Sequence, residues 1–96
     1  MYTKQLILNY LKENKELFQK KYDIDTIALY GSYAKNQQTK SSDIDILVSS
    51  HKKIKDIDKL KQNLQLHFKS TIDILDEKNI ILPTMKKMIT KECLYV

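Results

Sequence analysis

The chain has 96 residues, 42% of them hydrophobic, which is the size of one domain with one modest core. No apolar run approaches the roughly 18 residues of a membrane span, and the single cysteine, Cys93, excludes an intramolecular disulfide. Seventeen basic residues, all lysine, against 12 acidic ones give a net charge of +5, and without arginine's planar fork we do not expect nucleic acid as a partner. We therefore predict one cytoplasmic domain over residues 1–96, with no membrane partner.

The first 30 residues favour a helix followed by a strand. Thr3 is a residue type that caps helices, and apolar residues recur after it at helical spacing. Residues 24–30 are rich in Ile, Leu and Tyr and end at Gly31, the chain's one glycine. We expect a strand there that stops at a turn.

The middle of the chain favours two further strands with a helix between them. Residues 36–42 are polar and predict a loop, whereas residues 43–48 alternate isoleucines with Asp43 and Asp45. Apolar residues at helical spacing then predict a long helix over about residues 52–67, before a third strand at residues 71–75.

Pro83 suits the first turn of a closing helix that runs to about residue 90, and residues 94–96 predict a short terminal strand. This order predicts an α/β fold: a small mixed β-sheet with helices packed on one face, the isoleucine face.

Aspartates occupy strand positions that would ordinarily be apolar. Asp43 and Asp45 are two residues apart, so they leave the same face with Cα atoms about 6.6 Å apart. The tetrapeptide Ile-Asp-Ile-Leu at residues 44–47 recurs at residues 72–75 and puts Asp73 on the third strand with the same alternation. If these strands are neighbours, the three carboxylates converge.

Clustered carboxylates repel one another unless a cation neutralises them, and all-oxygen ligands suit Mg²⁺. Two such ions about 4 Å apart would stabilise an in-line phosphoryl displacement. The alternative is that the aspartates form only the solvated face of an antiparallel sheet. The third aspartate, on a matching strand, favours the metal site.

Gly31 and Ser32 follow the first strand directly. Backbone N–H groups at such a turn, with the serine hydroxyl, could hold phosphate oxygens, although a Gly-Ser pair is usually only a turn. The position of the pair shortly before Asp43 favours a role in binding phosphate.

The sequence Tyr-Gly-Ser-Tyr-Ala at residues 30–34, a gap of ten residues after Ser32, and Ser-Asp-Ile-Asp-Ile at residues 42–46 together resemble a known signature. It is that of the minimal nucleotidyltransferase family, a branch of the DNA polymerase β-like superfamily. The resemblance covers nearly the whole chain and implies a polymerase β-like nucleotidyltransferase palm. It implies that Asp43, Asp45 and Asp73 are the catalytic residues and ligate two Mg²⁺ ions, with Asp73 beside the incoming hydroxyl.

The same resemblance implies that Gly31, Ser32 and Lys35 bind the phosphates of a nucleoside triphosphate. Family members often have arginine and glycine where this chain has Lys35 and Asn36. Lysine keeps the charge but loses the fork, which affects the tightness of nucleotide binding, while asparagine tolerates a left-handed turn.

The resemblance implies an enzyme that transfers AMP from ATP to a hydroxyl group. Stand-alone members of this size resemble antitoxins that adenylylate a tyrosine of a HEPN ribonuclease toxin encoded nearby. The alternative is an antitoxin that neutralises its partner by stoichiometric binding, with little or no catalysis.

Overall fold

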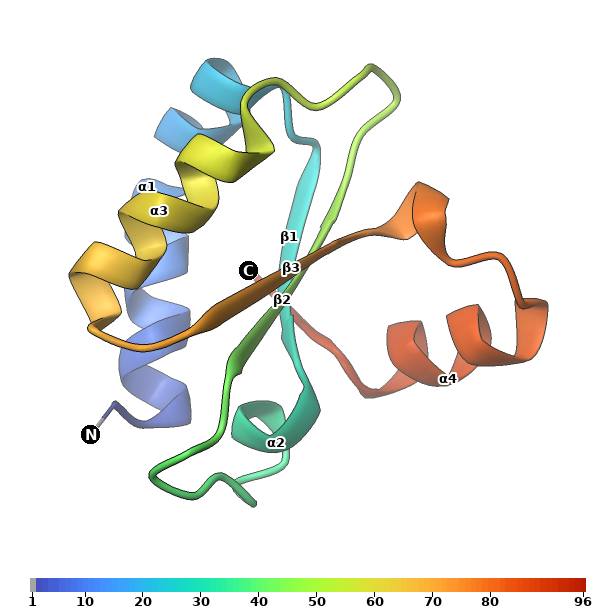
Figure 1. Cartoon of the computed structure of the whole chain (residues 1–96). Helices are drawn as coiled ribbons and strands as arrows, with labels where there is room; N and C mark the ends of the chain where they lie inside the picture. Colours follow the sequence, from blue (N-terminus) through green and yellow to red (C-terminus); the bar gives the residue numbers. More distant parts are fainter. Residues whose placement is uncertain (1) are drawn as a thin grey trace.

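The computed structural model describes residues 2–96 and is built on a four-stranded sheet in the order β3-β2-β1-β4 (Figure 1). β1 (Thr26–Tyr30) pairs antiparallel with β2 (Ile44–Ser49), and β2 pairs parallel with β3 (Ile72–Asp76). β4 (Leu94–Tyr95) joins the free edge of β1 antiparallel. The mixed sheet confirms the predicted fold class.

Among residues 2–96, one α-helix precedes the sheet, and three α-helices and one short 3₁₀ turn, η1 (Glu77–Asn79), connect the strands. The helices are α1 (Lys4–Tyr22), α2 (Gly31–Ala34), α3 (Ile57–Phe68) and α4 (Pro83–Glu92). As predicted, Thr3 caps α1, because its side-chain oxygen accepts the backbone N–H of Leu6 at 3.3 Å. No helix among residues 2–96 is long and apolar enough to cross a membrane.

The main core lies between the isoleucine face of the sheet and the helices α1 and α3, which Figure 1 shows together on one side of the sheet. Ile44, Ile46 and Val48 of β2 are fully buried there. The helices contribute buried residues at helical spacing, among them Ile7, Leu11, Leu60 and Leu64. This packing confirms the predicted core face.

A smaller cluster lies on the opposite face of the sheet, against which α4 packs (Figure 1). The helices therefore do not all lie on one face as the sequence predicted, because the closing helix crosses to the second face before β4 pairs with β1. Its buried members are Ala28, Leu47 and Cys93, and Leu75 and Ile89 pack against them. Strand alternation puts the side chains of Asp45 and Asp73 on this second face. The candidate site therefore lies beside a second, minor core.

The predicted helix over residues 52–67 starts later than expected, at Ile57. Asp56 has a left-handed backbone with φ 48°. A right-handed helix cannot run through such a residue, so α3 begins only after it. The segment before Asp56 is not helical, because Lys55 donates its N–H to the carbonyl of Tyr22 at 2.9 Å and not to a carbonyl of a helical turn. A tertiary hydrogen bond of this kind has no local sequence signal.

Candidate active site

The turn after β1 is fitted closely around Asp45. Gly31 has φ +75°, and a Cβ atom at this position would overlap the Asp45 carboxylate oxygen Oδ2. Only glycine combines this backbone with this close approach. The Asp45 carboxylate therefore lies directly against the backbone of the Gly31-Ser32 turn.

The loop beyond the turn is closed by backbone hydrogen bonds. Lys35 N–H donates to the carbonyl of Gly31 at 3.2 Å, and Gln37 N–H donates to the carbonyl of Ser32 at 2.8 Å. Asn36, where relatives often have glycine, takes the left-handed conformation with φ 57°. The loop keeps its shape without a second glycine.

Strand register puts Tyr30, Asp45 and Asp73 in one row across the sheet. Asp45 is the partner of Asp73 in the parallel β2–β3 pair and of Tyr30 in the antiparallel β1–β2 pair. Neighbouring strands lie about 4.8 Å apart, so the two carboxylates are immediate neighbours. Asp43, just before β2, is two residues further along the same face.

The carboxylates affect one another. Burial, followed by the charges of Asp73 and Asp43, raises the pKa of Asp45 to about 6. Burial and the charges of Asp73 and Asp45 raise the pKa of Tyr30 to about 12, so its phenol stays protonated at neutral pH. Tyr30 is the member of the row that sequence analysis did not assign a role, because only the β1–β2 register reveals it.

The donor set fits a hard divalent cation. Asp43 and Asp73 are exposed and Asp45 is half-buried. A dication would remove the repulsion from Asp73 and Asp43 that adds to burial in raising the pKa of Asp45. Among residues 2–96, however, no three acidic, histidine or cysteine side chains form a ready-made metal cage. The expected convergence is thus partial: the carboxylates are close enough to interact, and a cation would have to draw them together.

Lys35 is engaged elsewhere in this structure. Its Nζ lies 2.9 Å from Oε2 of Glu92 at the end of α4, and both side chains are about half-exposed. A nucleotide phosphate would compete with this carboxylate for Lys35. The predicted binding of phosphates by Gly31, Ser32 and Lys35 stays a prediction.

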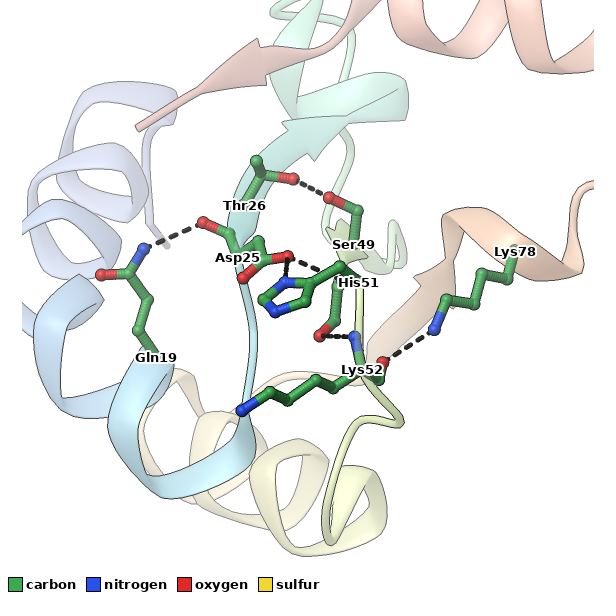
Figure 2. A network of polar contacts seen from close by, with 8 residues as sticks. Gln19, Asp25, Thr26, Ser49, His51, Lys52 and Lys78 are labelled. Atoms are coloured by element: carbon green, nitrogen blue, oxygen red, sulfur yellow. Dashed lines mark hydrogen bonds and ion pairs between the residues drawn. The ribbon is translucent and has the colours of Figure 1, made fainter.

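A polar network closes the other end of the sheet (Figure 2). Oδ2 of Asp25 accepts the backbone N–H of His51 at 2.7 Å and contacts the His51 ring Nδ1 at 2.6 Å. These hydrogen bonds lower the pKa of Asp25. The hydroxyls of Thr26 and Ser49 are hydrogen-bonded to each other. The network therefore links the start of β1 to the end of β2, away from Asp43, Asp45 and Asp73.

A mixed sheet that sets a glycine turn against a cross-strand aspartate pair is the arrangement that the sequence resemblance implies for a polymerase β-like nucleotidyltransferase. The family model described as "Polymerase beta, Nucleotidyltransferase" matches residues 12–96. The chain belongs to this family, and it is a nucleotidyltransferase.

Relatives from Methanocaldococcus jannaschii are named as candidate protein adenylyltransferases. Two of them, MJ0126 and MJ1379, are each 33% identical to this chain, with all of both chains covered. A solved structure described as a candidate minimal nucleotidyltransferase superposes with a TM-score of 0.80 at 19% identity, covering 97% of this chain and 95% of that one. A chain from a toxin-antitoxin crystal structure with AMP-PNP superposes with a TM-score of 0.69 at 23% identity, covering 98% of this chain and 72% of that one.

Proposed function

We propose that this protein transfers AMP from ATP to a hydroxyl group of a partner protein, in a reaction that depends on Mg²⁺. The observation that carries the proposal is the cross-strand pair of Asp45 and Asp73 beside the Gly31 turn. The relatives named as candidate protein adenylyltransferases support AMP as the transferred group and a protein as its acceptor.

In this reaction the acceptor oxygen forms a bond to the α-phosphorus of ATP. The bond from that phosphorus to the oxygen bridging to the β-phosphate breaks, and pyrophosphate leaves. Asp73, the exposed member of the pair, accepts the proton of the hydroxyl and passes it to solvent. Gly31 and Ser32 hold the phosphates through backbone N–H groups and the serine hydroxyl.

Asp43, Asp45 and Asp73 would hold the Mg²⁺, with two ions expected. When bound, the cations supply charge neutralisation for the phosphates and for the carboxylates themselves. The raised pKa of Asp45 supports this assignment, because the charges of Asp73 and Asp43 add to burial in raising it, and a bound cation would relieve that repulsion.

The proposed acceptor is a tyrosine of a HEPN ribonuclease toxin encoded nearby, which makes this protein an antitoxin. The resemblance described above supports this partner, and a chain of a toxin-antitoxin complex has the same fold. The second candidate function is neutralisation by stoichiometric binding. It is favoured by the ion pair that occupies Lys35 with Glu92.

The test is an incubation of the purified protein with that toxin, Mg²⁺ and ATP labelled at the α-phosphate. We expect label on the toxin, at a tyrosine located by mass spectrometry, and none when EDTA replaces Mg²⁺. Asp45→Asn should abolish the transfer, whereas Asp58→Asn, an exposed aspartate on α3, should leave it unchanged. No label with the wild-type protein, or equal label with Asp45→Asn, would overturn the proposal.

A further inference from the structure

Helix α4 and the two residues before it carry an exposed apolar surface, which we call the α4 patch: Ile81, Leu82, Met85 and Met88. These side chains are 89%, 62%, 49% and 56% exposed. Every residue of α4 is at least partly exposed, so the helix holds to the rest of the molecule mainly through Ile89 and the segment that follows it. A cluster of this kind on a small protein marks an interaction surface.

Lysines border the α4 patch. Lys87 and Lys91 flank Met88 at helical spacing and line with it a shallow groove of about 360 Å³. Neither lysine forms an ion pair with any residue from 2 to 96. Three lysines against one glutamate make residues 81–92 basic. The surface is therefore complementary to an apolar area bordered by carboxylates.

The α4 patch also adjoins the candidate active site. Ile89 and Leu75 pack against the cluster that contains Leu47. Leu47 and Leu75 lie two residues along their strands from Asp45 and Asp73, on the same face of the sheet. At its C-terminal end α4 is joined to the loop after the Gly31 turn by the Lys35–Glu92 ion pair. A molecule seated on α4 would lie beside the aspartates.

We infer that the α4 patch docks the partner protein, through an apolar surface that Asp and Glu side chains border, and so brings the acceptor hydroxyl to Asp45 and Asp73. The identity of the partner and the delivery of its hydroxyl rest on the proposed function, whereas the place of the docking surface rests on the exposed apolar side chains and the lysines of this segment. A second copy of this chain fits less well, because a twofold pairing of α4 helices would bring the lysines of both copies together.

The test compares two exposed apolar sites in binding to the toxin, measured by calorimetry. The double variant Met85→Glu, Met88→Glu should weaken binding at least tenfold. The matched control is Leu66→Glu on α3, where the side chain is 77% exposed on the other side of the sheet, and it should bind like the wild type. Both variants should keep wild-type ATP affinity, which shows that the site is intact.

Further measurements test the contribution of the lysine charges and the identity of the molecule that docks on the α4 patch. Lys87→Glu, Lys91→Glu should also weaken binding at least tenfold, and raised salt should weaken the wild-type complex. Wild-type affinity in the Met85, Met88 double variant would overturn the inference. Failure of the wild-type chain to bind the toxin would also overturn it. The same holds if the wild type forms a dimer in sedimentation that the double variant does not form, or binds anionic lipid vesicles that the double variant does not bind.

This design separates the two proposals. If the wild type and Asp45→Asn both bind the toxin and the Met85, Met88 variant does not, the docking surface stands even when no AMP is transferred. If AMP is transferred equally by the wild type and the Met85, Met88 variant, the proposed function stands and the docking surface is wrong.

Discussion

At the scale of single residues, Gly31 links the backbone to the candidate chemistry. We expect Gly31→Ala to destabilise the fold by about 1–3 kcal/mol, because alanine is strained at φ +75°, and to displace the Asp45 carboxylate that its Cβ would overlap. AMP transfer should fall at least tenfold. Thermal unfolding and the labelled-ATP assay measure the two effects.

A double-mutant cycle shows whether Gly31 acts through Asp45. Adding Gly31→Ala to Asp45→Ala, which removes the overlapping carboxylate, should cost less stability in urea unfolding than adding it to the wild type, since residues in contact are not additive. An unchanged melting temperature in Gly31→Ala would contradict the close approach seen at this turn.

The raised pKa of Asp45 predicts how the stability of the metal-free protein, in EDTA, depends on pH. Its pKa of about 6 in the folded protein is above the usual 3.8, so folding raises its affinity for a proton. The ionised carboxylate therefore destabilises the fold above pH 6, and the penalty disappears as the pH falls toward 4. Asp45→Asn should be about 1 kcal/mol more stable than the wild type at pH 7.5, after allowance for solvent screening, and the difference should vanish near pH 4.

Urea unfolding of both proteins at pH 4, 5, 6 and 7.5 measures this difference, with Asp58→Asn as the exposed control. A stability difference that grows as the pH falls would show that the ionised carboxylate is stabilised in the folded protein. That result would contradict the repulsion between Asp45 and its neighbouring carboxylates. Adding Mg²⁺ at pH 7.5 should reverse the order, because only the wild type would gain stability from the bound ion.

At the scale of elements, β2 is buried on both faces except at Asp45 and at its last residue, Ser49. Ile46 and Leu47 are each 1% exposed but belong to different clusters. Ile46→Ala and Leu47→Ala should each cost about 2–5 kcal/mol, while Asp73→Ala, at the exposed position of β3, should stay within about 0.5 kcal/mol. Denaturant unfolding tests the order, and a neutral Leu47→Ala would mean that the cluster below α4 does not stabilise the fold.

The same strand shows what sequence could predict. Alternation along residues 43–48 was enough to place the isoleucines in the core and the aspartates on the other face, because strand side chains have a period of two. Alternation carries no information about neighbours, so the parallel β2–β3 pairing and the place of Tyr30 opposite Asp45 needed the structure. The Lys35–Glu92 contact was also out of reach, since it joins residues far apart in the chain.

At the scale of the whole molecule, the proposed catalytic site and the proposed docking surface are adjacent but separate. The aspartates project from the sheet, and the α4 patch projects from a helix that packs beside them. Substitutions should therefore separate the two activities. This separation provides the means to tell an enzyme from a protein that only masks its partner.

The double variant Asp43→Ala, Asp45→Ala should bind the toxin like the wild type but transfer no AMP to it. Removal of either aspartate alone should disable transfer almost as fully as removal of both, because residues that act as one unit are not additive. If transfer is the means of neutralisation, cells that express the toxin should die with this variant and survive with the wild type at equal expression. Survival with the variant, with no adduct on the toxin by mass spectrometry, would show that binding suffices and would put the masking function first.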